Sequence, residues 1–159
     1  MLKIQKIENL TISISKQCLK ISFQAFGENY HNIHFFNSDK KIKLIALRNK
    51  VVIGFLIAQK INLNTIKIEL IVVINNYQSK SVGTSLMSYF FKNITTQKTK
   101  IIVNAWKSLN GIHAQKLFEK FNLKAIKNNG YVWKDECNIK FKCSFYKNQC
   151  ICQSILYTK

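Results

Sequence analysis

The stretch Tyr77-Gln78-Ser79-Lys80-Ser81-Val82-Gly83-Thr84-Ser85-Leu86 joins two apolar segments of different periodicity. Residues 66–74, before it, are rich in Ile, Leu and Val, which is typical of a central strand. Residues 83–94, within and after it, carry apolar side chains at helical spacing. Small residues allow close approach of a ligand, and a helix N-terminus offers unpaired N–H groups. The stretch therefore predicts an anion site that a pyrophosphate would fit; the simpler alternative is a solvated turn with a serine N-cap.

The segments around this loop predict a sheet with helices on its faces. Strands are expected at residues 3–7, 44–47, 51–58, 66–74 and 101–105, and helices at 83–94 and 114–121. Residues 19–26 and 33–36 suit short helices or strands equally. In 66–74, alternation places Ile66, Ile68, Leu70, Val72 and Ile74 on one face. Residues 123–126 and 131–133 predict a closing hairpin around Asn128-Asn129-Gly130, since Asn-Gly suits a tight turn.

Length and composition predict a single globular domain over residues 1–159. The chain has 159 residues, of which 47% are hydrophobic and 20% charged. No apolar run reaches the roughly 18 residues that a membrane span needs, and residues 1–8 lack a secretory apolar core. Five cysteines, an odd number, favour free thiols in a reducing compartment. We therefore expect a cytoplasmic protein without membrane association.

The net charge of +18 raises the possibility of a nucleic-acid partner. Nearly all of the positive charge is Lys, and Arg48 is the only arginine, whereas bidentate contacts to phosphate and guanine are made chiefly by Arg. Nucleic acid is therefore a possible partner but not the favoured one. The charge would in either case steer an anionic cofactor toward the protein.

The loop and the region around it, residues 43–133, resemble the GNAT superfamily of N-acetyltransferases. The family's acetyl-CoA loop follows a strand and reads Gln/Arg-x-x-Gly-x-Gly/Ala; Gln78 and Gly83 match, and Ser81 stands at the first Gly. Residues 103–106 and 114–123 are similar to the family's next strand and to a helix ending in Leu-Tyr-Glu-Lys-x-Gly-Phe. The resemblance implies an α/β (α+β) fold with a mixed, mostly antiparallel sheet flanked by helices, and acetyl-CoA as cosubstrate.

The resemblance also implies which residues bind the cofactor. A main-chain N–H near Val73 would stabilise the oxyanion, and the strand edge at residues 72–74 would pair with the pantetheine arm. Phe118 stands where the family usually has its acid, Tyr, and Asn110 lies one place from a usual Asn. The expected cofactor-binding residues are Val72, Val73, Gln78, Ser79, Lys80, Ser81, Val82, Gly83, Thr84, Asn110 and Phe118.

Acetyl transfer to an amine requires a group that accepts a proton, because a free alkylamine has a pKa of about 10.4. Glu69 is the candidate base, since its apolar neighbours Ile68 and Leu70 would desolvate it, and GNAT enzymes commonly have a Glu near this position. The alternative is a solvent-facing Glu69 paired with Lys67. For the acid, Tyr131 is a candidate if the closing hairpin reaches the site; a structural tyrosine and a water molecule are the alternatives. The histidines are assigned no role.

Residues 134–159 form a Cys-rich C-terminal extension. Cys137, Cys143, Cys150 and Cys152 could hold a structural zinc ion tetrahedrally. The extension is similar to one seen in some bacterial GNAT proteins, with Tyr146 and Lys147 where those have Cys and Gly. The alternative is that the thiols only pack, as free cysteines usually do.

The leading hypothesis is an acyl-CoA-dependent N-acetyltransferase that moves an acetyl group from acetyl-CoA to a primary amine by direct attack in a ternary complex. A second is a toxin-like acetyltransferase acting on aminoacyl-tRNA, which the basic charge favours and Phe118 disfavours. A third is a CoA- or nucleic-acid-binding module on a GNAT scaffold that has lost its chemistry, suggested by Ser81 and Phe118. The protein is expected to be a monomer or a homodimer.

Overall fold

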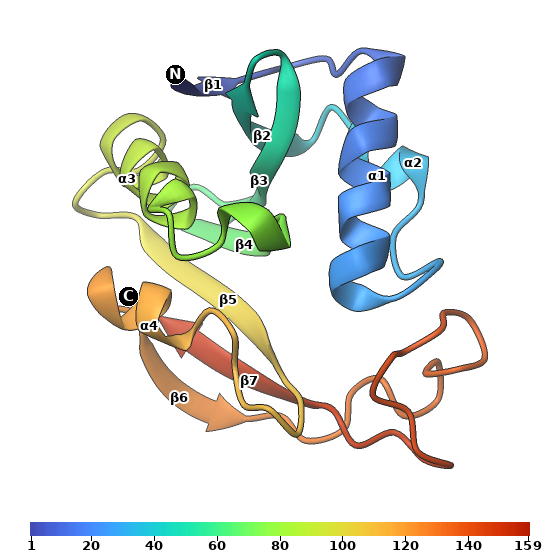
Figure 1. The fold of residues 1–159 in the computed structure, drawn as a ribbon. Coiled ribbons are helices and arrows are strands. Elements are labelled where there is room, and N and C mark those ends of the chain that lie inside the picture. Colours follow the sequence, from blue (N-terminus) through green and yellow to red (C-terminus); the bar gives the residue numbers. More distant parts are fainter.

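A seven-stranded sheet with the strand order β1-β2-β3-β4-β5-β7-β6 runs through the protein (Figure 1). The computed structural model describes all residues, 1–159. The strands are β1 (Leu2–Lys6), β2 (Lys41–Arg48), β3 (Val51–Asn62), β4 (Thr65–Val73), β5 (Lys100–Lys107), β6 (Lys124–Asn128) and β7 (Gln153–Thr158). Only β4 and β5 pair in parallel. The predicted mixed, mostly antiparallel sheet is confirmed.

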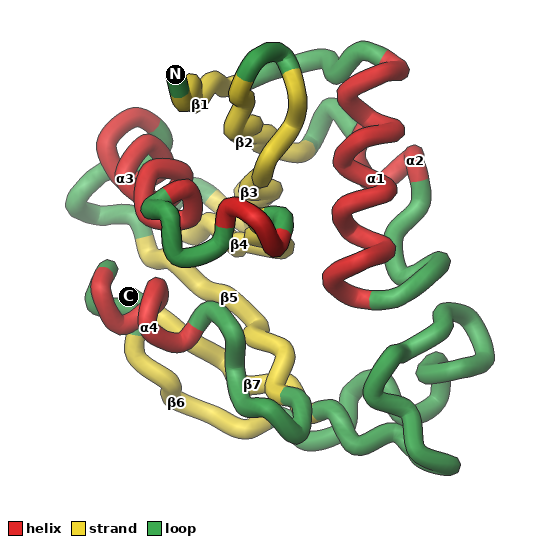
Figure 2. Tube along the Cα trace, viewed as in Figure 1, coloured by secondary structure: helices red, strands yellow, loops and turns green.

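Helices cover both faces of the sheet (Figure 2). One face carries α1 (Ile12–Phe26) and α2 (Ile33–Asn37), and the other carries α3 (Val82–Asn93) and α4 (Gln115–Lys120). The larger core, of 18 buried residues, lies under α3 and α4, and a core of nine lies under α1 and α2. Residues 19–26 and 33–36, whose mixed spacing suited helices and strands equally, are therefore helical. None of the helices is long and apolar enough to cross a bilayer.

The central strand β4 changes the face on which its apolar residues lie. Ile66 and Ile68 pack in the core under α3, whereas Leu70 and Val72 pack in the core under α1. The cause is a β-bulge, because Ala58 of β3 pairs with Ile68 and Ile57 pairs with Leu70, so that Glu69 has no opposite residue. The prediction that these apolar residues share one face is wrong, and Glu69 lies at the bulge.

Strands β4 and β5 separate beyond the bulge. Their parallel pairing runs from Thr65–Lys100 to Ile68–Val103, although both strands continue, to Val73 and Lys107. On the other side of β4, the N–H of Ile74 donates to Ile53 O at 3.1 Å. Successive N–H groups of a strand point to opposite sides. The N–H of Val73 therefore points into the opening that β5 has left.

The predicted closing hairpin is wrong. Strand β6 pairs with β7, not with residues 131–133, and β7 lies between β5 and β6. Residues 129–152, which we name the excursion, leave the sheet at Asn129 and return at Gln153 (Figure 1). The excursion packs on the α1–α2 connection, where Lys142 N donates to Glu28 O at 2.9 Å. A Cβ at Gly27 would lie 1.8 Å from Lys142 O, so this contact requires glycine.

Candidate active site

The loop between β4 and α3 folds back onto the end of β4. It contains a short 3-10 turn (Asn75–Tyr77), and the Gln78 side chain donates to Val73 O at 3.0 Å and to Asn75 Oδ1 at 3.1 Å. Ser79 and Ser81 adopt left-handed conformations with φ of 58° and 62°. Such a conformation costs a non-glycine residue about 1 kcal/mol. Ser81 therefore keeps the positive φ that glycine would adopt at this position.

The N-terminus of α3 has no side-chain cap. Ser81 is the N-cap residue, but its hydroxyl makes no capping hydrogen bond, and its carbonyl accepts the Ser85 N–H at 2.9 Å. The N–H groups that begin the helix are consequently free for a ligand, and the helix dipole makes the position favourable for an anion. Lys80 and Arg48 both lie over the Tyr77 ring, 5.5 and 5.6 Å from its centroid, and add positive charge. The predicted alternative of a serine cap is not observed.

Gly83 lies where α3, α4 and β4 come together. A Cβ there would be 3.2 Å from Leu117 Cδ2 and 3.8 Å from Val73 Cγ2. Both neighbours are side chains, so close packing, and not an unusual backbone angle, favours a small residue at this position. This packing holds the free end of α3 against the strand that carries the Val73 N–H.

A cavity of about 340 Å³ opens on the α1 face where β4 and β5 separate. Its walls come from the α1–α2 region, from β4 and β5, and from the excursion together with the start of β7. It is lined by Tyr30, His31, Phe35, Lys67, Ile68, Glu69, Asn104, Asn129, Val132, Trp133 and Ser154. Ile68 belongs to the last paired position of β4 and β5, and Glu69 and Asn104 follow it on the two strands. The cavity and the opening between the strands therefore share these residues.

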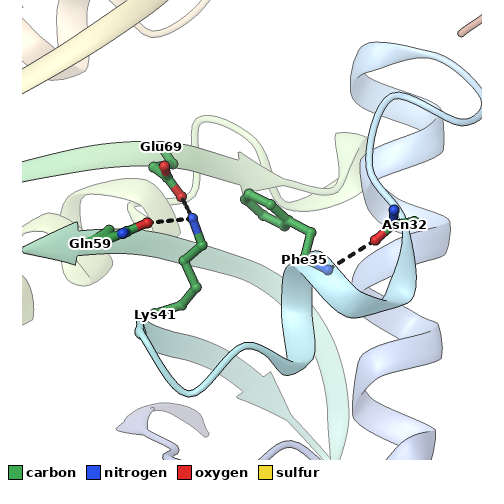
Figure 3. Close-up of polar contacts among 5 residues, drawn as sticks. All are labelled: Asn32, Phe35, Lys41, Gln59 and Glu69. Atoms are coloured by element: carbon green, nitrogen blue, oxygen red, sulfur yellow. Dashed lines mark hydrogen bonds and ion pairs between the residues drawn. The ribbon is translucent and has the colours of Figure 1, made fainter. Parts of the chain in front are cut away.

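Glu69 is held by Lys41 from β2 (Figure 3). Lys41 Nζ forms an ion pair with Glu69 Oε2, donates to Gln59 Oε1 at 2.7 Å, and lies 4.9 Å from the centroid of the Phe35 ring. The Lys41 and Glu69 side chains are only 13% and 18% exposed. Neither the solvent-facing position nor the Lys67 pair considered from the sequence is observed. The Oε1 oxygen accepts no hydrogen bond from the protein and is available to a bound acceptor.

His31 and Tyr30 also line this cavity, although the sequence pattern gave neither a role. His31 Nδ1 lies 2.7 Å from Ser22 Oγ, and its ring packs at 4.3 Å from that of Phe35. Tyr30 OH accepts the indole N–H of Trp133 at 2.9 Å, which connects the α1–α2 connection to the excursion. Burial, together with the nearby Lys41 charge, lowers the pKa of His31 to about 4. His31 is therefore neutral at pH 7.

The buried neutral His31 predicts a loss of stability in acid. Its pKa is about 4 in the fold, against an ordinary 6.5, so the unfolded chain binds the additional proton between these values and stability falls as pH drops through that range. We expect the free energy of unfolding to fall by about 2 kcal/mol between pH 7.5 and pH 5 through this group. Urea unfolding at the two pH values measures it. The His31→Phe variant should lack this component; an unchanged pH dependence would contradict the assignment.

The other predicted site residues lie at the edge of the α3 N-terminus and of the Glu69 cavity. Phe118 is 2% exposed and packs 5.2 Å from the Tyr157 ring, so its side chain has little surface left for a cofactor. Asn110 lies in the turn after β5, where its N–H donates to Ser108 Oγ at 3.2 Å. Tyr131 is 52% exposed, and its neighbours Val132 and Trp133 line the cavity in its place. The side chains of Val72 and Val82 are buried, so a cofactor would contact mainly their backbone atoms.

The four thiols of the extension come together in an apolar cluster. Cys137, Cys143 and Cys152 are buried, and Cys143 Sγ lies 3.9 Å from Cys152 Sγ. They pack with Trp106 and other aromatic rings, and burial raises the pKa of Cys137 and Cys152 to about 12. No group of three or more ligating side chains is arranged to hold a metal ion. The burial of these thiols among aromatic rings is the arrangement that the packing alternative expects, and the zinc site stays a prediction.

If the four thiols act only through their packing, they stabilise the fold without a metal ion. Cys152→Ala should lower the free energy of unfolding by about 1–2 kcal/mol, because it leaves a small cavity. The matched control is Cys18→Ala, at a buried thiol outside the cluster, which should lose a similar amount. A chelator should change the melting temperature of neither variant nor of the parent protein. Stoichiometric zinc in the purified protein, removable with loss of stability, would contradict this prediction.

The model of the acetyltransferase (GNAT) family matches residues 11–123. This range includes α1, β4, the loop with Ser81, and α4. A search of curated protein sequences gives no match.

Solved structures of similar fold cover nearly the whole chain. An aminoglycoside 6'-N-acetyltransferase complexed with coenzyme A superposes with a TM-score of 0.77 at 13% identity, over 99% of this chain and 96% of that one. The ribosomal-protein-S18-alanine N-acetyltransferase from Escherichia coli has a TM-score of 0.73 at 13% identity, over 99% and 92%. A GNAT family acetyltransferase from Elizabethkingia anophelis with acetyl-CoA bound has 0.70 at 16%, over 99% and 96%. At such identities the likeness concerns the fold.

Proposed function

Because the chain belongs to the GNAT family of acetyltransferases, we propose that it transfers an acetyl group from acetyl-CoA to a primary amine. The acceptor amine would attack the thioester directly while both substrates are bound. The observation that carries the proposal is the separation of β4 and β5 between the uncapped N-terminus of α3 and the cavity of Glu69. An anion site and an acceptor cavity would then lie on the two sides of one opening.

Acetyl-CoA would enter this opening with its pyrophosphate at the end of α3. The free N–H groups of the first helical turn and the charge of Lys80 support that placement. The pantetheine arm would pair with the free edge of β4, and the thioester carbonyl would accept the Val73 N–H. Because a main-chain donor is already oriented, it stabilises the oxyanion without reorganisation during the reaction. Two of the similar structures hold coenzyme A or acetyl-CoA, which is consistent with this cosubstrate.

Glu69 would remove the proton of the acceptor amine. Its Oε1 oxygen is free, while the ion pair with Lys41 through Oε2 holds the carboxylate in position. The proton passes to Oε1 directly or through one water molecule, and the neutral amine then attacks the thioester carbon. Lys41 is a positioning residue in this proposal.

The leaving thiolate would take its proton from water. A phenylalanine stands at position 118, and its ring lies in the core. A thiol has a pKa of about 8.5, so the thiolate is a good leaving group and requires little help from an acid. Tyr131 remains a second candidate, because the excursion that carries it also forms a wall of the cavity.

Release of free CoA thiol from acetyl-CoA tests the proposal. The acceptor panel should contain short peptides, free amino acids, polyamines, an aminoglycoside and aminoacyl-tRNA. We expect amine-dependent thiol release from at least one of these classes. If acetyl-CoA raises the melting temperature but no acceptor yields thiol, the chain is a CoA-binding module without transferase activity.

A further inference from the structure

The charges around the acceptor cavity are unbalanced. Glu69 is the only carboxylate that lines the cavity, and Lys41 neutralises it. Lys67 also lines the cavity and forms no ion pair with any Asp or Glu. The ammonium group of Lys67 therefore lies in the cavity wall without a carboxylate of the protein as its counter-ion.

The rest of the protein strengthens this field. The chain contains 25 Lys and Arg residues against seven Asp and Glu. Burial raises the pKa of Tyr30 in the cavity wall, and the nearby Glu136 adds to this effect. Glu136 is itself paired with Lys140. A polycationic amine would meet repulsion both on approach and within the cavity, whereas an anionic group would be attracted.

We infer that the acceptor is an amine that carries its own anionic group, a carboxylate or a phosphate, and that Lys67 binds this group. The inference rests on the proposed function for the role of the amine. Lys67 and Glu69 are two residues apart on β4, so their Cα atoms are about 7 Å apart. An anion bound at Lys67 therefore places the amine a few bonds away, at Glu69 Oε1. Tyr30, Phe35 and Trp133 form aromatic walls for the part of the acceptor between the two groups.

Binding in the presence of CoA, which has no acetyl group to transfer, tests the inference without turnover. The probes are two pairs of tripeptide amides that differ only at the first residue: Glu against Gln, and phosphoserine against Ser. Isothermal titration should give a Kd at least tenfold lower for the acidic peptide than for the neutral peptide in one of the two pairs. Spermidine should bind more weakly than both peptides of that pair. The pair that shows the difference distinguishes carboxylate from phosphate recognition.

Lys67→Glu should abolish the preference, whereas Lys98→Glu, which makes the same charge change on an exposed turn, should retain it. Equal binding or no binding of the acidic and neutral peptides overturns the inference, as does tight binding of spermidine. Selective binding of the acidic peptide without thiol release from acetyl-CoA would instead overturn the proposed transferase function and leave the recognition by Lys67 standing.

Discussion

Gly83→Val should raise the Kd for coenzyme A at least about 100-fold, because it removes the alignment of several main-chain donors at once. The first added carbon would lie 3.2 Å from Leu117 Cδ2 and 3.8 Å from Val73 Cγ2, and we expect the two further methyl groups to crowd these side chains. The beginning of α3 must then move away from β4, and its free N–H groups no longer point at a pyrophosphate beside the Val73 N–H. Isothermal titration of coenzyme A measures the loss.

Two further variants separate this effect from a general loss of structure. Gly83→Ala adds only the first carbon against the flexible end of Leu117, so its loss should be smaller. Ser88→Val places the same β-branched side chain on the exposed side of α3, and it should bind coenzyme A normally. Circular dichroism and the melting temperature report whether the helix is intact. An unchanged affinity in a folded Gly83→Val protein would contradict the assignment of the loop.

Glu69→Gln should lower kcat by about 100-fold or more, which is the ordinary contribution of a general base. The amide retains the size and the hydrogen bond to Lys41 but does not take a proton from an amine. The affinity for coenzyme A should change little, because Glu69 faces the acceptor cavity on the α1 side. Steady-state thiol release with a saturating acceptor, together with titration of coenzyme A, measures both quantities.

Glu119→Gln is the matched control, since Glu119 is an exposed residue of α4 that bonds to Gln115. It should have parental kcat. A parental kcat in Glu69→Gln would remove Glu69 from the mechanism. A parallel loss of coenzyme A affinity would show instead that the Lys41–Glu69 pair supports the structure of β4.

The strand, loop and helix around Ser81 could be predicted from the sequence because their signals are local. Periodic apolar residues define β4 and α3, and a few small residues mark the turn between them. The closing hairpin was predicted wrongly for a related reason. Asn129-Gly130 is a strong local turn signal, but the partner of β6 is decided by burial of Ile155 and Tyr157 of β7 in the core. The 24 residues of the excursion separate that partner from β6 along the chain.

The candidate site shows the same division. Glu69 could be named from its position in an apolar strand, yet its partner Lys41 lies 28 residues earlier and joins it only because β3 pairs with both strands. The bulge at Glu69 could not be predicted, because an apolar residue stands at every second position of residues 66–74 in the sequence, without any interruption at Glu69. His31 and Tyr30 carry no motif, and they reach the cavity through the packing of α1 and α2 on the sheet.

The sequence by itself was enough for the resemblance to the GNAT family, through the motif with Gln78 and Gly83. It also predicted the strand–loop–helix unit around Ser81 and the mixed sheet, because periodicity, small loop residues and helix spacing act between near neighbours in the chain. Only the tertiary structure decided that Lys41 holds Glu69, that Lys67 lies unpaired in the cavity, that β7 closes the sheet and that the thiols pack together. These features depend on contacts between residues far apart in sequence, which arise only when the sheet assembles and buries its two faces.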